Sequence, residues 1–153
     1  MQYIAIALLV GLMGCTDVPT SGGATAVSDQ PAGAARALFS SRPAELFAAA
    51  DAVCDAPGQV VVRPSANEVR CESLPDPESA AALILQFNGD VENLPKFVIS
   101  FAGAPAAAGF VVTADSYIRV PQRTGGAQQI RFPDPRIKAE LESLLETAGG
   151  QPF

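Results

Sequence analysis

The stretch GFVVTADSYIRV at residues 109–120 carries the clearest strand pattern in this chain. Successive side chains of a strand point to opposite faces of a sheet, so alternate residues share an environment. One alternate set is mostly apolar and the other is mixed: Phe110, Val112, Ala114, Ser116, Ile118 and Val120 against Val111, Thr113, Asp115, Tyr117 and Arg119. We therefore expect a strand with one face in the core and the other in solvent.

Other segments on both sides of this strand also favour strands. In residues 96–101, Phe97, Ile99 and Phe101 share one face, and residues 68–73 alternate in the same way. The remaining predicted strands are 59–63, 80–87 and 128–132. A helix is the alternative for 80–87, because Asp76, Pro77 and Glu78 have the character of a helix start. The small residues at 102–108 are expected to form a loop.

Two helices are expected at the ends of the domain. Pro43 lies at the start of an apolar helical pattern that ends at Cys54, before Pro57 and Gly58. Asp134 and Pro135 have the character of an N-cap and first helical residue. The predicted fold is α+β: an antiparallel meander of five or six strands with both helices packed on one face. The domain spans residues 35–150 and a short tail spans residues 151–153.

The N-terminus carries an apolar run, Met1 to Met13, followed by Gly14 and Cys15. The run is too short to span a bilayer but has the length of a signal-peptide core. Leu12-Met13-Gly14-Cys15 resembles the lipobox of bacterial lipoproteins. The resemblance implies that residues 1–14 are a signal peptide, cut away after a diacylglycerol is attached to Cys15. An ordinary signal peptide with a chance cysteine, or an uncleaved anchor, is the alternative.

The resemblance also implies a location. The protein would be held to a membrane by covalent lipid, and Thr16 after Cys15, in place of aspartate, favours the periplasmic face of the outer membrane. Residues 15–34 comprise the lipidated cysteine and a tether rich in Gly, Pro, Ser and Thr, whose composition cannot bury a core.

Two cysteines remain once Cys15 is assigned to lipid. Cys54 lies on the apolar side of the first predicted helix, and Cys71 lies on the inward side of the strand at 68–73. We expect them to form a disulfide in an oxidising compartment, with two buried free thiols as the alternative.

Composition excludes several kinds of chemistry. The formal net charge of −6 argues against nucleic acid as a partner, and the chain has no His, so Ser-His catalysis, Cys-His catalysis and most zinc sites are excluded. The carboxylate pairs Asp76 with Glu78 and Asp90 with Glu92 are typical of turns, although calcium binding there is an alternative. We expect no enzyme activity, no catalytic residues, no metal site and no cofactor.

Charge distribution gives the one indication of a binding surface. Acidic residues dominate positions 68–92 and basic residues dominate positions 119–138. Arg119 and Arg131 are expected on the outward face of neighbouring strands, beside Tyr117 and Thr113, and Arg with Tyr is a common interface composition. The alternative is that these side chains only keep the sheet surface hydrated.

The sequence thus predicts a lipid-anchored cell-envelope protein with a small non-enzymatic domain that binds an envelope protein or polymer. A second hypothesis is an inhibitor of an envelope-degrading hydrolase, which would insert the loop at 102–108 into the cleft of that enzyme.

Overall fold

The computed structural model describes residues 30–153. The predicted signal peptide, Cys15 and the tether as far as residue 29 lie outside the described residues. From residue 30 onward, the chain makes a turn in which the Ala34 amide donates to the Pro31 carbonyl at 3.0 Å, and then enters the first strand.

The fold is α+β, as predicted, with seven antiparallel strands and three helices. The strands are β1 (Ala35–Phe39), β2 (Gln59–Ser65), β3 (Glu68–Ser73), β4 (Lys96–Ala106), β5 (Gly109–Pro121), β6 (Ala127–Ile130) and β7 (Gln151–Pro152). The helices are α1 (Ala44–Val53), α2 (Pro77–Gln86) and α3 (Pro135–Thr147).

The sheet has the order β2-β3-β4-β5-β1-β7, and β6 also pairs with β5. The 13 residues of β5 are long enough to hold two partners on one edge. Near its start β5 pairs with β1, where Ala37 lies opposite Val112, and near its end it pairs with β6, where Ile118 lies opposite Ile130. The meander predicted from the sequence is therefore present from β2 to β6, and β1 and β7 extend it.

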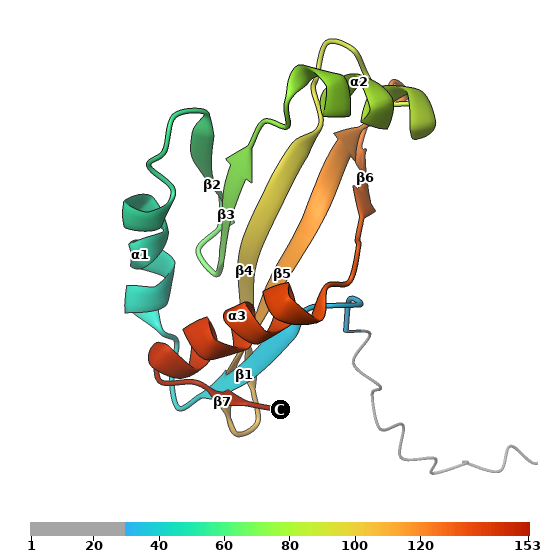
Figure 1. Ribbon diagram of the computed structural model, residues 1–153. Coiled ribbons are helices and arrows are strands. Elements are labelled where there is room, and N and C mark those ends of the chain that lie inside the picture. Colours follow the sequence, from blue (N-terminus) through green and yellow to red (C-terminus); the bar gives the residue numbers. More distant parts are fainter. Residues whose placement is uncertain (1–29) are drawn as a thin grey trace, which may run out of the picture.

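All three helices pack on the same face of the sheet (Figure 1). The main core joins Leu46 and Phe47 of α1 and Leu141 and Leu145 of α3 to inward side chains of the sheet. A second cluster joins Leu83 of α2 to β5. We call the opposite side of the sheet, which no helix of the described residues covers, the open face.

Helix α3 begins as the sequence predicts. The Asp134 side chain accepts a hydrogen bond from the Arg136 amide at 2.8 Å, and Pro135 occupies the first turn. This arrangement satisfies an amide that would otherwise have no partner inside the helix. The side chain of Leu145, a residue of α3, is completely buried in the core.

The strand predicted at 80–87 is wrong, because residues 80–86 belong to α2 and Phe87 is its C-cap. Asp76 accepts hydrogen bonds from the amides of Glu78 and Ser79, and this cap with Pro77 starts a helix. The apolar run then follows a helical period, with Leu83 and Ile84 buried and Leu85 exposed. Cap geometry and alanine propensity outweigh the β preference of a short apolar run.

The loop predicted at 102–108 is also wrong in most of its length. Strand β4 continues to Ala106, which pairs with Gly109 of β5, so only two residues form the turn. Gly103 is required there because a Cβ would lie 2.3 Å from a ring carbon of Phe110. The pairing with β5 compensates for the poor strand propensity of this small-residue segment.

The predicted count of five or six strands is too low because β1 and β7 were not foreseen. Two of the five residues of β1 are alanines, which favour strands weakly, although Ala35, Ala37 and Phe39 do alternate inward. Strand β7 has only two residues, too few to carry a pattern.

Candidate functional site

The four residues predicted to form a binding surface all lie on or beside the open face. Thr113, Tyr117 and Arg119 are on β5, and Arg131 directly follows β6. The expected exposure of Tyr117 is wrong, however, since only 6% of this residue is accessible.

Arg131 makes internal contacts that explain the burial of Tyr117. Its guanidinium lies 5.1 Å from the centre of the Tyr117 ring and contacts the Asp115 carboxylate, with Nη2 to Oδ2 at 2.7 Å. It also donates to the Gln129 side chain at 2.7 Å. Arg131 therefore closes over β5 where neither β1 nor β6 pairs with it, and acts there as a packing residue.

The centre of the open face is a network of polar side chains. Burial raises the pKa of the Tyr117 hydroxyl, and the nearby Arg70 charge and a hydrogen bond with Ser100 only partly oppose this effect. Arg70 in turn pairs with Glu68 at 2.6 Å. Among the described residues, the one buried side-chain polar atom without a hydrogen bond is Oδ1 of Asp115.

Thr113 and Arg119 remain partly accessible at the two ends of the open face. Thr113 borders a shallow hollow near the turn between β4 and β5, together with Arg36 and Ala102. Arg119 lies at the other end, directly opposite Lys96 on β4. The structure therefore separates these two residues and does not combine the four into one accessible patch.

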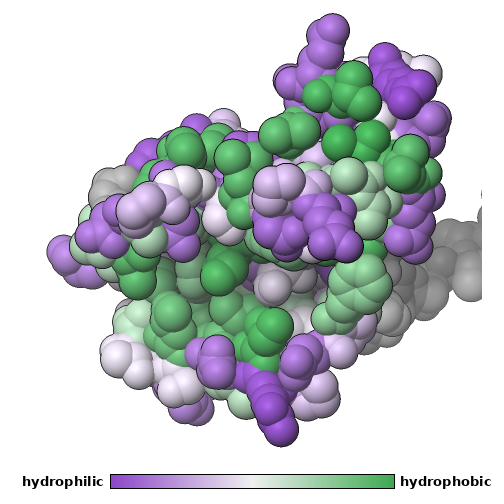
Figure 2. Space-filling model, turned by 45° about the horizontal axis from the view of Figure 1, so that its top comes forward, coloured by the Kyte–Doolittle hydropathy of each residue, from purple (hydrophilic) through white to green (hydrophobic). Residues whose placement is uncertain are grey.

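The opposite, helix-bearing face carries a cavity that the sequence did not reveal. We call it the helix-face groove. It encloses about 300 Å³, and its apolar lining includes Phe97, Ile99, Ile118, Ile130, Phe132 and Ile137. Figure 2 shows hydrophobic atoms gathered around a hollow in this region. No charged side chain of the described residues lines it.

The floor of the groove is formed by central strands of the sheet. Phe97 and Ile99 of β4 are 44% and 46% exposed, although β4 has neighbours on both sides. Their companion Phe101, further along the strand, packs against the main core. Large apolar side chains exposed together in the middle of a sheet are unusual for a soluble domain and commonly mark a binding surface.

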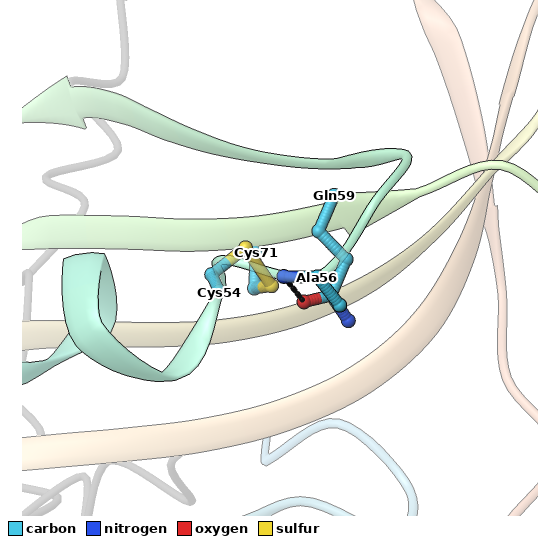
Figure 3. The surroundings of a disulfide bond; sticks show 4 residues. All are labelled: Cys54, Ala56, Gln59 and Cys71. Carbon is cyan, nitrogen blue, oxygen red and sulfur yellow. Dashed lines mark hydrogen bonds between the residues drawn. A yellow bond between two sulfur atoms is a disulfide. The ribbon is translucent and has the colours of Figure 1, made fainter.

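The disulfide stands at one end of the groove. Cys54, directly after α1, is bonded to Cys71 of β3 with Cα atoms 5.7 Å apart, which confirms the predicted pairing. Cys71 and Gln59 both line the groove. The Gln59 side chain also accepts a hydrogen bond from the Ala56 amide at 3.3 Å (Figure 3), so it holds the turn between α1 and β2.

Sequence reasoning placed Phe97 and Ile99 on the inward face correctly but missed the groove. An inward side chain is expected to be covered, and a strand at 80–87 leaves no reason to expect a gap between helices. The signal in the sequence is the row of three large inward side chains, Phe97, Ile99 and Phe101, on one short segment.

The carboxylate pairs have structural roles in their loops. Asp76 caps α2, and Asp90 holds its loop by accepting from the Glu92 amide at 3.0 Å and from the Asn93 side chain at 2.6 Å. The pKa of Asp76 is lowered mainly by a hydrogen bond with the Ser79 side chain and then by the capped amides, and the pKa of Asp90 mainly by the Asn93 side chain and then by the Glu92 amide. Within residues 30–153, no group of three or more His, Cys, Asp or Glu side chains is arranged to hold a metal ion.

Comparison with known proteins adds no assignment: no protein-family model matches the chain, and no curated protein matches it either. In the described part of the chain, no helix has both the length and the apolar character needed to cross a membrane.

Proposed function

We propose that this chain is a lipid-anchored protein of the cell envelope whose domain binds another envelope protein and catalyses no reaction. The lipobox-like sequence ending at Cys15 supports a lipid anchor, and the outer membrane is the proposed location. The disulfide between Cys54 and Cys71 fits an oxidising compartment such as the periplasm.

The observation that carries the binding function is the exposure of Phe97 and Ile99 on a central strand. Burying half-exposed apolar side chains stabilises a complex by about 25 cal/mol for each Å² removed from water. Because the groove lies between packed elements of the domain, it offers a partner a concave apolar surface already in place.

The spacing of the helices suggests the shape of the partner. Helix α3 contacts β1 and the part of β5 paired with β1, whereas α2 packs on Ile118 and Val120. Along β5 the midpoints of these two regions, Val112 and Arg119, are seven residues apart, which is about 23 Å at the usual rise of a strand. Packed helices lie about 8–10 Å apart, so the interval has room for one further helix. We propose that an amphipathic helix of the partner occupies it.

The uncharged lining defines the chemistry of that helix. A charged side chain facing Phe97, Ile99 and Ile118 would lose its hydration without gaining an ion pair. The contacting ridge of the partner should therefore be apolar, with its polar residues directed away from the groove.

Affinity purification of the lipidated protein from cells tests this proposal. The variant Phe97→Ser with Ile99→Asn should lose the bound partner, and mass spectrometry of the same preparation should show acylated Cys15. A matched variant, Leu85→Asn, changes an apolar residue that is 83% exposed outside the groove and should retain the partner. Retention of the partner by the groove variant would contradict the proposed site, and a soluble product cut elsewhere than before Cys15 would contradict the anchor.

A second candidate, an inhibitor of an envelope hydrolase, draws on the hairpin between β4 and β5. Pairing of β3 with β4 ends at Ala102, and beyond it the Gly103 amide donates to the Asn67 carbonyl at 2.8 Å. Residues 104–108 of the hairpin are exposed. Replacing Ala107 by Trp should abolish inhibition and leave groove binding unchanged if this candidate is correct.

A further inference from the structure

Lys96 and Arg119 are positioned as an unneutralised pair of positive charges on the open face. The register places Lys96 of β4 directly opposite Arg119 of β5. Like charges at such positions destabilise an antiparallel pair. Among the described residues, neither side chain has an ion pair.

The cations at the centre of this face, in contrast, form ion pairs. Arg70 is paired with Glu68, and Arg131 is paired with Asp115. The sheet therefore supplies a carboxylate to each of these arginines but leaves the two charges at its far end without one. Arg36 of β1, also on the open face, has no ion pair either, but its guanidinium lies 4.8 Å from the centre of the Phe153 ring. Among the described residues, Lys96 and Arg119 thus have neither a carboxylate nor an aromatic ring as a partner, which leaves a place for a negative group.

The two cations also share a hollow with exposed apolar side chains. The hollow encloses about 370 Å³, and its lining is Lys96, Arg119, Asn93, Glu92, Leu74, Leu94 and Pro121. Leu74 and Leu94 are 49% and 42% exposed. Glu92 is the single carboxylate in this lining, so the local charge stays positive.

Hydrogen bonds within the loop 90–93 order one wall of the hollow, and none of them involves Lys96 or Arg119. Asp90 lies nearby in sequence, but its carboxylate accepts from the Glu92 amide and from the Asn93 side chain. Asp90 thereby orders the loop 90–93 and does not pair with Lys96 or Arg119. The positions of the charges and of the leucines are consequently held together by the loop and the sheet.

We propose that this hollow binds an anionic amphiphile, meaning a phosphate monoester or diester that carries an apolar chain. The guanidinium of Arg119 can donate two hydrogen bonds to phosphate oxygens, and Lys96 adds a second charge. Leu74 and Leu94 contact the first carbons of the chain. The ligand is either a soluble amphiphile or a phospholipid headgroup in a membrane. The site is on the opposite side of the sheet from the helix-face groove and does not depend on it.

Titration with octyl phosphate, below its micelle concentration, tests the site. The full chain carrying Cys15→Ser, which lacks the proposed lipid, is followed by amide chemical shifts in NMR. We expect shifts at Lys96, Arg119 and Leu94, and about tenfold weaker binding for Arg119→Gln. Arg136→Gln makes the same change of charge on exposed α3 and should bind as the parent does. Equal weakening in both variants, or binding of inorganic phosphate as tight as that of octyl phosphate, would overturn the proposal.

Two further measurements complete the test. Arg119→Gln relieves the repulsion from Lys96, so its melting temperature without ligand should equal or exceed that of the parent, whereas a drop of several degrees would assign Arg119 a structural role and overturn the proposal. Sedimentation with vesicles of phosphatidylcholine containing phosphatidylglycerol distinguishes the sources. Pelleting that depends on Arg119 identifies a membrane headgroup, and octyl phosphate binding without pelleting identifies a soluble ligand.

Discussion

Cys71 of β3 lies directly opposite Ile99 of β4, so the disulfide and the exposed isoleucine are neighbours on the floor of the helix-face groove. The bond to Cys54 ties the end of α1 to this floor, and the bonded cysteines are 17 residues apart. The same covalent link that stabilises the domain therefore also fixes one end of the helix-face groove.

Removal of the disulfide should destabilise the domain. For Cys54→Ala with Cys71→Ala we expect the free energy of unfolding to fall by about 3 kcal/mol, because the unfolded chain regains the freedom of the loop. Denaturant unfolding measures this change, and in the native wild type neither cysteine should react with iodoacetamide. Ready alkylation of Cys71 in the folded wild type would contradict the pairing.

The groove residues should matter little for folding, in contrast with the core. Ile99→Ala should lower the free energy of unfolding by about 1 kcal/mol, since the side chain is half-exposed, whereas Leu145→Ala should lower it by about 3 kcal/mol because its site is closed. Parallel urea titrations compare them. Similar losses for both variants would mean that the groove is part of a closed core.

The pair of Arg131 with Asp115 should act as a structural unit. Arg131→Ala leaves a carboxylate that is almost fully buried, and we expect a loss of about 2 kcal/mol. Asp115→Asn in the same chain should recover part of that loss by removing the buried charge. A double-mutant cycle in unfolding free energy measures the coupling. Additive effects of the two substitutions would show that the pair contributes nothing as a pair.

Asp76 should make the stability of the domain depend on pH. A hydrogen bond with the Ser79 side chain, together with those that Asp76 accepts from the amides of Ser79 and Glu78, lowers the pKa of Asp76, so the ionised form is favoured in the folded state. The stabilisation is complete above the ordinary pKa of an aspartate, about 4, and is lost as the pH falls through the lower pKa of the folded state. Wild type should therefore melt above Asp76→Ala at pH 7, and the difference should shrink in acid. A difference that is constant from pH 7 to pH 2 would exclude this origin.

The sequence was sufficient where a local pattern and the tertiary packing favour the same structure. The alternation along β5, the cap of α3 by Asp134 and the pairing of Cys54 with Cys71 were each predicted and are present. The first depends on the two-residue period of a strand, the second on the chemistry of a helix cap, and the third on the inward direction of two side chains. A few neighbouring residues are enough to predict each of these.

The sequence was insufficient where distant elements decide the outcome. Residues 80–86 have an apolar run compatible with either structure, and the cap at Asp76 selects the helix. The burial of Tyr117 depends on Arg131, which reaches it from the far end of β6. The helix-face groove depends on where α2 and α3 lie across the sheet, and no single segment encodes that spacing.

Site-specific photocrosslinking in intact cells tests the groove as a binding site most directly. A benzophenone amino acid at position 97 should yield a crosslink to one envelope protein through a helical segment of that protein, and Ile99→Asn should remove this crosslink. The same probe at position 111, on the open face, should not capture it. Capture of the same protein from position 111 but not from position 97 would contradict binding in the helix-face groove and would indicate that the partner binds the open face.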